Sequence, residues 1–140
     1  MADNERFARA LQTVFRGLHR QSRERARGGE LTPQQADALA AIAERAAVST
    51  TALAALLGID PSTASRNLAG LERAGLIARK KAAGDGRQTE VRLTARGKRM
   101  AEQVGARSIQ SHVALFDRLT RSDRASAVAA LETLASLFEG

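Results

Sequence analysis

The sequence predicts a mainly α-helical protein that carries one two-stranded β-hairpin, and three observations predict this class. Apolar residues recur at helical spacing over most of the 140 residues. Aromatic residues form only 3% of the chain, so alanine and leucine dominate it, and these favour closely packed helices. One basic segment, residues 77–94, instead alternates in polarity around glycines. The length and the 44% hydrophobic content fit one compact domain.

The first helix and the start of the second are marked by their sequences. Apolar residues recur at helical spacing near the N-terminus, at Phe7, Leu11, Val14, Phe15 and Leu18. Gly28 and Gly29 then break this helix. Thr32 and Gln35 form a capping box around Pro33, a residue suited to the first helical position. The second helix is therefore predicted to begin at Pro33.

Two short helices follow in the middle of the chain. Residues 50–57 predict the first, which ends at Gly58. Asp60 is the predicted cap of the second, which ends near Gly75. Their short connection gives the pair the proportions of a helix-turn-helix. The residues of the second helix that share an inward face are Ala64, Leu68 and Leu71.

The hairpin of residues 77–94 lies in the segment that carries most of the net charge. Gly84 and Gly86, on either side of Asp85, suit the positive-φ positions of a tight turn. From residue 79 to residue 99 the chain has eight basic and two acidic residues, a local charge of +6 against +7 for the whole chain. This density indicates a polyanionic partner, either nucleic acid or an acidic membrane surface, although a charge run is also typical of a solvated face. The segment lacks the large apolar anchors of a membrane-surface protein.

Long helices are expected at both ends of the chain. Thr94 is predicted to cap a helix that runs to about Leu119, and Thr120 or Ser122 to begin the last one. Their apolar stripes need a covering surface, and a second copy offers one, so we predict a homodimer. The alternative is that the stripes cover the central helices within one chain. The candidate dimer contacts are Phe7, Leu11, Leu115, Leu119, Val128, Leu131, Leu134 and Phe138.

The second helix of the pair and the hairpin together suit double-stranded DNA. Short hydroxyl side chains let a helix enter the major groove, where Ser and Thr bond base edges or phosphates and Arg binds guanine. In the hairpin Asp85 can orient Arg87 toward a narrow minor groove. The alternative is an ordinary solvated surface. The predicted DNA contacts are Ser62, Thr63, Ser65, Arg66, Arg73, Arg79, Lys80, Lys81, Asp85 and Arg87, and Gly70 is assigned to the same outer face of the helix.

Several classes of protein are disfavoured by composition. The chain has no cysteine, which removes disulfides, thiolate metal sites and thiol-based sensing. His19 and His112 are its only histidines, so neither a metal site nor a cofactor is predicted. It has no phosphate-binding Gly-x-x-x-x-Gly-Lys motif and no paired carboxylates in an apolar setting, so no enzyme is predicted. No apolar run approaches the roughly 18 residues of a membrane span, and we expect a cytoplasmic protein.

The ordered set of motifs resembles the MarR family of winged helix-turn-helix regulators. The matching pieces are LTPQQADAL, VSTTALAALLGIDPSTASRNLAGLERAGLI, RKKAAGDGRQTEVRLTARGK and LTRSDRASAVAALETLA. The resemblance implies a homodimer that binds a pseudo-palindromic operator, with an N-terminal dimerisation helix (1–30), a DNA-binding region (31–99) and C-terminal dimerisation helices (100–140). It places base recognition at Ser62, Thr63, Ser65 and Arg66, and the wing contacts at Asp85 and Arg87.

The resemblance also implies regulation by a small molecule. Relatives often lose DNA affinity when an anionic aromatic effector binds, and we expect this chain to be a repressor that such an effector releases. Here the effector site would draw on Phe15, Arg16 and His19, together with the helix between Leu31 and Arg45. The competing function is an architectural DNA-binding protein with little sequence preference and no ligand, because phosphate contacts carry no sequence information.

Overall fold

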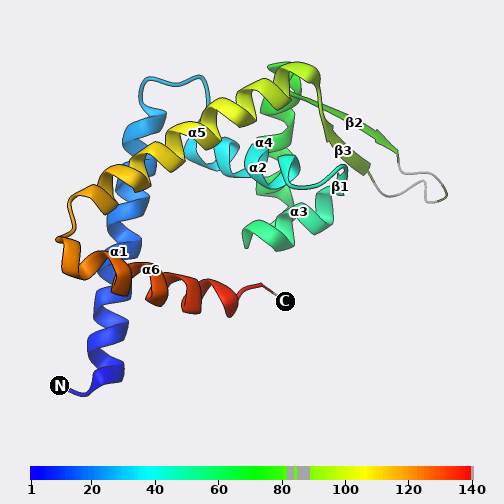
Figure 1. Ribbon diagram of the computed structural model, residues 1–140. Helices are drawn as coiled ribbons and strands as arrows, with labels where there is room; N and C mark the ends of the chain where they lie inside the picture. Colours follow the sequence, from blue (N-terminus) through cyan, green and yellow to red (C-terminus); the bar gives the residue numbers. More distant parts are fainter. Residues whose placement is uncertain (82–83, 85–88, 140) are drawn as a thin grey trace. The chain divides into compact units, whose positions relative to one another are not determined.

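The mainly helical fold is confirmed by the computed structural model, which describes residues 1–81, 84 and 89–139 (Figure 1). Helices account for 71% of the described structure. The elements are α1 (Asp3–Ala26), α2 (Pro33–Ala43), β1 (Val48–Ser49), α3 (Thr50–Leu57), α4 (Pro61–Arg73), β2 (Ile77–Lys81), β3 (Thr89–Leu93), α5 (Ala95–Asp117) and α6 (Arg121–Ser136). The chain divides into two compact units, Met1–Arg107 and Ser108–Gly140.

The helix starts follow the capping residues that the sequence predicts. Thr32 accepts a hydrogen bond from the Gln35 amide, and the Gln35 side chain returns one to the Thr32 amide, so the capping box is confirmed. Asp60 caps α4 by accepting from the Thr63 amide. Gly58 and Gly75 end the two short helices with positive φ angles of 66° and 75°, which glycine adopts without strain.

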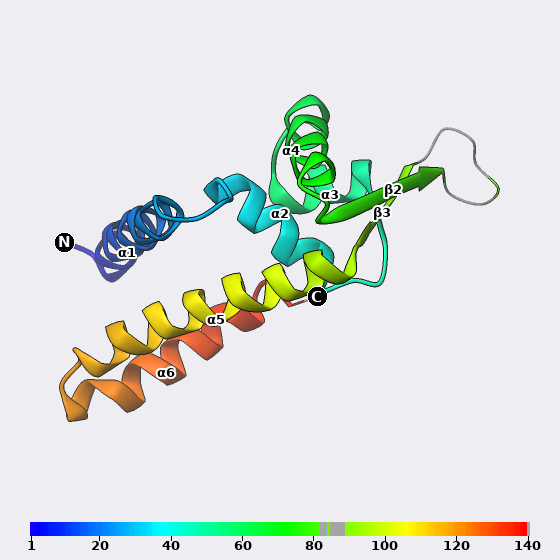
Figure 2. The same ribbon diagram turned by 90° about the horizontal axis from the view of Figure 1, so that it is seen from above.

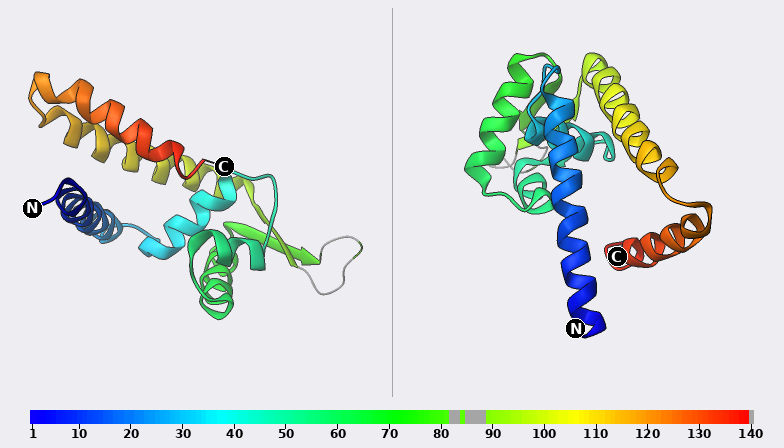
Figure 3. Two further views of the ribbon diagram at one scale, coloured as in Figure 1. Left: turned by 90° about the horizontal axis from the view of Figure 1, so that it is seen from below. Right: turned by 90° about the vertical axis from the view of Figure 1, so that its left-hand side faces the viewer.

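A three-stranded antiparallel sheet closes the first unit, with the strand order β1-β3-β2. The hairpin pairs Ile77 with Leu93 and Lys81 with Thr89, as the alternating pattern predicts. The third strand is a finding that the sequence analysis missed: Val48 pairs with Val91 on the free side of β3. Figures 2 and 3 show β2 and β3 extending away from the helices α2, α3 and α4.

The core lies between α2, α3, α4 and the sheet. The inward face predicted for α4 is confirmed, because Ala64, Leu68 and Leu71 are all buried. The largest side chains that are fully buried are Leu39, Ile42, Leu53, Leu68, Leu71, Leu76 and Val91. This core holds the α3–α4 pair and the hairpin as one body, because each of these elements contributes to it.

Thr94 and Gly97 join the hairpin to the start of α5. The Thr94 hydroxyl donates to the Gly75 carbonyl oxygen at 2.7 Å and accepts from the Gly97 amide at 3.0 Å, so the predicted cap is confirmed. A Cβ atom on Gly97 would lie 1.9 Å from the carbonyl oxygen of Leu76. Only glycine fits there, and this contact fixes the first turn of α5 against the α4–β2 connection.

The terminal helices bury almost nothing within one chain. Neither α1 nor α6 has a buried residue, and Gly97 is the one buried residue of α5. Within the second unit, the Arg124 guanidinium lies 5.0 Å from the centre of the Phe116 ring and donates to the Asp117 carbonyl oxygen at 3.2 Å. These contacts hold the turn between α5 and α6.

Candidate nucleic-acid interface

The outer face of α4 presents the polar and basic side chains that the sequence predicts for it, with one exception. Ser62, Ser65, Arg66 and Arg73 are exposed, and Thr63 is half-buried. The assignment of Gly70 to this face was wrong. A Cβ atom there would lie 2.6 Å from the Gln35 side-chain nitrogen, because α2 packs at this point of α4.

A hydrogen-bonded network occupies the first turn of α4. The Asp60 carboxylate accepts from the Ser62 hydroxyl and, at 2.6 Å, from the Thr63 hydroxyl. The same Thr63 oxygen accepts from the Arg66 guanidinium at 3.2 Å. The bonds from the Ser62 and Thr63 hydroxyls, followed by the Thr63 amide, lower the pKa of Asp60 to about 2. Asp60 is therefore ionised at neutral pH, and four residues of this turn form one connected group.

Arg79 is tied to α4 rather than directed freely into solvent. Its guanidinium donates to the Glu72 carboxylate at 3.2 Å, and the Arg79 side chain is only 24% exposed. This ion pair links β2 to the last turn of α4. A phosphate contact by Arg79 would therefore compete with an interaction inside the protein, which the sequence analysis did not foresee.

Two other basic residues of the charged segment are also paired. Arg92 contacts the Glu90 carboxylate at 2.6 Å, and Arg96 contacts that of Glu30 at 3.7 Å. Lys80 and Lys81 are exposed and form no ion pair with a described residue. The described basic residues of this segment that are exposed and in no ion pair with a described residue are therefore Lys80, Lys81, Lys98 and Arg99.

The tip of the hairpin is described only at Gly84. Its φ angle of 88° agrees with the prediction that a glycine occupies a positive-φ position of the turn. Asp85 and Arg87, the predicted wing contacts, lie outside the described residues.

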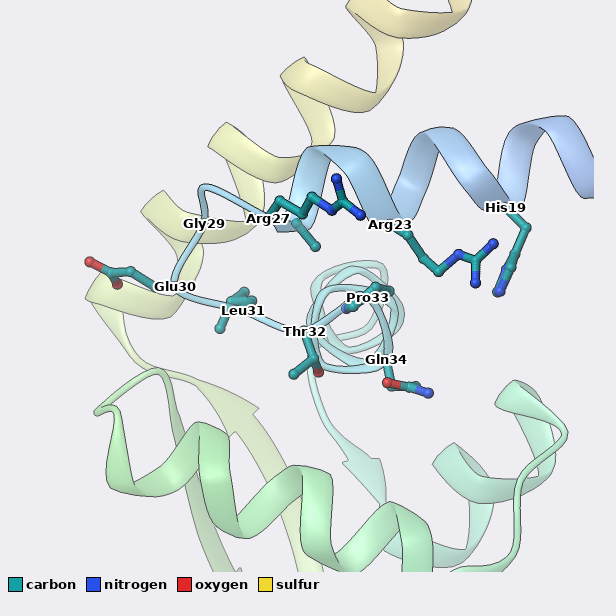
Figure 4. Close-up of a pocket in the computed structure, with 10 residues that line it drawn as sticks. His19, Arg23, Arg27, Gly29, Glu30, Leu31, Thr32, Pro33 and Gln34 are labelled. Atoms are coloured by element: carbon teal, nitrogen blue, oxygen red, sulfur yellow. The ribbon is translucent and has the colours of Figure 1, made fainter.

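A separate cavity of about 460 Å³ lies between α1 and the first turn of α2. Figure 4 shows His19 and Arg23 directed from α1 toward this turn, and Arg27 also lines the cavity. Of the predicted effector residues, Phe15 stacks on the His19 ring at 6.2 Å, but Arg16 bonds Thr13 and does not line the cavity.

The sequence analysis missed Arg23 and Arg27. Both follow His19 at intervals of four residues, and this spacing on one helical face could have identified them. Nearby, partial desolvation raises the pKa of Asp37, and the charges of His19 and Arg25 oppose that rise.

The terminal helices expose the apolar side chains that were predicted to make dimer contacts. Phe7, Leu11, Leu115, Val128, Leu131 and Phe138 are exposed, and Leu119 and Leu134 are half-buried. Further exposed apolar residues of these helices and the C-terminus that the sequence analysis left out of this set are Val14, Phe15, Ile109, Val113 and Leu137. Exposed apolar surface on this scale marks an interaction site more often than a free surface.

Two other kinds of site were sought in the part of the chain that the structure describes. It contains no group of three or more His, Cys, Asp or Glu side chains that could hold a metal ion. Across the same residues, no helix combines the length and the apolar character needed to span a bilayer.

The fold of the first unit, a helix-turn-helix followed by a two-stranded wing, defines a winged helix-turn-helix protein. A model of the MarR family matches residues 30–88. Wild-type MarR of E. coli, in its apo form, has a TM-score of 0.84 at 25% identity, over 91% of this chain and 94% of that one. Both the matching family model and this solved structure are of the MarR family of transcription regulators, to which the chain is similar.

Two structures solved with DNA share the fold at lower identity. S. aureus MepR in complex with DNA has a TM-score of 0.73 at 19% identity, over 94% of this chain and 97% of that one. S. pneumoniae FabT in complex with DNA has a TM-score of 0.78 at 19% identity, over 98% of each chain. A comparison with curated protein sequences gave no match.

Proposed function

We propose that the protein is a sequence-specific DNA-binding transcription regulator. The observation that carries the proposal is the exposed hydroxyl and arginine face of α4, which one core holds in fixed relation to the exposed Lys80 and Lys81 of the hairpin. A rigid unit of this kind can place a helix in the major groove while the strands contact the flanking backbone. MepR and FabT, which share the fold, have been solved with DNA.

In this proposal the residues divide between base reading and positioning. Arg66 binds guanine, and Ser62, Thr63 and Ser65 contact base edges. Arg73, Lys80 and Lys81 neutralise phosphates, and Arg79 joins them only if it leaves Glu72. From the sequence alone, Arg87 enters a minor groove with Asp85 as its orienting partner.

The regulator acts as a homodimer on a pseudo-palindromic operator. The exposed stripes of α1, α5 and α6 support this, because a second copy would remove Leu131 and Phe138 from water. Two copies of α4 related by a twofold axis would read half-sites about one helical turn apart, as dimeric helix-turn-helix proteins do.

The dimer represses transcription and is released by a small anionic effector. The cavity between α1 and α2 supports an anionic ligand, because His19, Arg23 and Arg27 line it together with a single carboxylate, that of Glu30. Adding benzoate as a probe should weaken operator binding by wild-type protein. Arg23→Gln should lower the sensitivity to benzoate and leave DNA affinity without benzoate unchanged.

Selection of DNA from a random pool by the purified protein tests the proposed function. A sequence-specific dimer will enrich one pseudo-palindromic site and bind it at least 10³-fold more tightly than random DNA, the lower end for specific regulators. Equal affinity for selected and random DNA would instead indicate the architectural function. Light scattering at micromolar protein tests the homodimer, and a wild-type monomer would remove the twofold operator from the proposal.

A further inference from the structure

The network around Asp60 fixes the direction of two hydroxyl protons on the DNA-facing end of α4. An ionised carboxylate has no proton to give, so it can only accept hydrogen bonds. The bonds that join the Ser62 and Thr63 hydroxyls to Asp60 must therefore be donated by the hydroxyls. Each hydroxyl has one proton, and in both residues that proton points at Asp60.

The direction of these protons determines which hydrogen bonds the two hydroxyls can still form with a partner. A hydroxyl has one donor and two acceptor positions, and here the donor is occupied. Arg66 also uses one acceptor position of Thr63, by donating to its oxygen at 3.2 Å. Only acceptor positions therefore remain free on Ser62 and Thr63. Free hydroxyls, by contrast, accept or donate as the partner requires.

We propose that Asp60 is a specificity-determining positioning residue, which makes Ser62 and Thr63 obligate hydrogen-bond acceptors and so selects bases that present an amino group. The inference rests on the proposed DNA-binding function. In the major groove, adenine N6 and cytosine N4 donate, whereas guanine O6 and thymine O4 accept. An acceptor placed over one strand therefore favours A or C on that strand and disfavours G or T.

The same hydrogen bonds to Asp60 prevent Ser62 and Thr63 from donating to phosphates. Phosphate oxygens are acceptors, so hydroxyls whose protons are already donated to Asp60 cannot bind them. The negative charge of Asp60 further repels the backbone. Asp60 therefore weakens binding to random DNA and strengthens the preference for one class of base, and both effects raise the ratio of specific to random affinity.

Asp60→Asn is the discriminating variant. Asparagine is as good a helix cap as aspartate, so thermal unfolding monitored by circular dichroism should change little. Ser62 and Thr63 donate to different oxygens of the Asp60 carboxylate, and the asparagine amide keeps an oxygen at only one of those two positions, so one of the two hydroxyls loses its acceptor and regains a free donor. Sites selected from a random pool should then differ between the two proteins.

The wild type is expected to prefer A or C over G or T by roughly three- to tenfold at one or two positions of each half-site, the range for single hydrogen bonds. In Asp60→Asn the ratio of affinity for A or C to affinity for G or T should fall toward unity in at least one of these positions. Affinity for random DNA should rise, because a negative charge facing phosphate is removed.

A second protein background distinguishes the effect of Asp60 on the hydroxyl protons from the effect of its negative charge. In the double variant Ser62→Ala, Thr63→Val no hydroxyl is left to orient, so adding Asp60→Asn should still raise affinity for random DNA but should not change base preference. Ser65→Ala is the matched control, because Ser65 lies outside the network; adding Asp60→Asn to it should relax the preference as in wild type.

The outcomes are distinct. A wild type that prefers G or T at the positions whose preference is lost in Ser62→Ala, Thr63→Val, or an Asp60→Asn variant with the wild-type base preference, overturns the role of Asp60 and leaves the DNA-binding function intact. A wild type that enriches no sequence overturns both proposals.

Discussion

Leu68 of α4 and Leu131 of α6 are the same residue type in similar helices, yet the first is fully buried and the second is 62% exposed. The contrast extends to whole regions. Every buried residue that the structure describes lies between Leu31 and Gly97, and the helices α1 and α6 contain none. Helical periodicity in the sequence shows that a helix has an apolar face. Which surface covers that face depends on the topology of the chain and on its assembly.

The two regions therefore have different tasks. The central region completes a core with its own residues and presents α4 and the hairpin from it. The terminal helices leave their apolar residues uncovered, and in our proposal these residues assemble the dimer. Substitutions in the two regions should consequently have different signatures.

The largest effect is expected at the junction that closes the central region. Gly97→Ala places a methyl group where a Cβ atom would lie 1.9 Å from the Leu76 carbonyl oxygen, and backbone cannot move aside as a flexible side chain can. We expect the free energy of unfolding to fall by about 3 kcal/mol, at the upper end for overpacking. Urea unfolding followed by circular dichroism measures it.

Gly105→Ala is the matched control on the same helix. A Cβ atom at Gly105 would have no neighbour within 4 Å, so alanine should stabilise α5 by roughly 0.5–1 kcal/mol through its helix propensity alone. Equal responses of Gly97 and Gly105 would show that the close approach to Leu76 does not hold α5 in place.

The next largest effect is expected on assembly. Leu131→Glu should weaken the dimer by about 3 kcal/mol, roughly a hundredfold in dissociation constant, because it buries a charge where the proposed interface is apolar. Sedimentation or light scattering over a range of concentrations measures this change. Thr133→Glu, which adds the same charge on the opposite side of α6, should leave the dimer unchanged. A dimer that tolerates Leu131→Glu would mean that the exposed face of α6 has another partner.

The sequence predicted the elements well because the signals for them are local. The capping residues Thr32, Asp60 and Thr94 act within a few residues of themselves, and their hydrogen bonds are as expected. The strand β1 escaped prediction because two residues are too few to show any periodicity. Its pairing with β3 is a long-range contact.

The parts of the site that sequence reasoning missed depend on distant partners. Charge counting treated Arg79 as free, but Glu72 on α4 holds it. The sequence analysis assigned Arg16 to the effector site and did not consider Arg23, which lines the cavity because α2 lies beside that part of α1. No local sequence pattern predicts that Glu72 lies beside Arg79, or that α2 packs beside this part of α1.

Arg66→Ala should separate base reading from assembly. If Arg66 binds guanine, the alanine variant should lose about 1–3 kcal/mol on the selected operator and relax the preference at one position of each half-site. Its dimerisation should equal that of wild type, because Arg66 belongs to the central region. Equal loss on operator and random DNA, measured by fluorescence anisotropy, would make Arg66 a phosphate contact.

The smallest effect compares two neighbouring residues of β2. Lys80 makes no ion pair with a described residue, whereas Arg79 is held by Glu72. If both contacted phosphate, neutralising either one would reduce the slope of log affinity against log salt by roughly 1 per subunit. We expect this reduction for Lys80→Gln and a smaller one, near zero, for Arg79→Gln.

Arg79→Gln should show its effect on stability instead. The Arg79–Glu72 pair is partly exposed, so its loss should lower the free energy of unfolding by less than about 1 kcal/mol. Glu72→Gln completes the comparison, because it removes the same ion pair while freeing the guanidinium. The salt slope should then steepen as Arg79 turns to the backbone, and Arg79→Gln in the Glu72→Gln background should reverse that gain. If Arg79→Gln alone reduced the salt slope by roughly 1 per subunit, DNA would draw Arg79 away from Glu72, and the ion pair would exist only in the free protein.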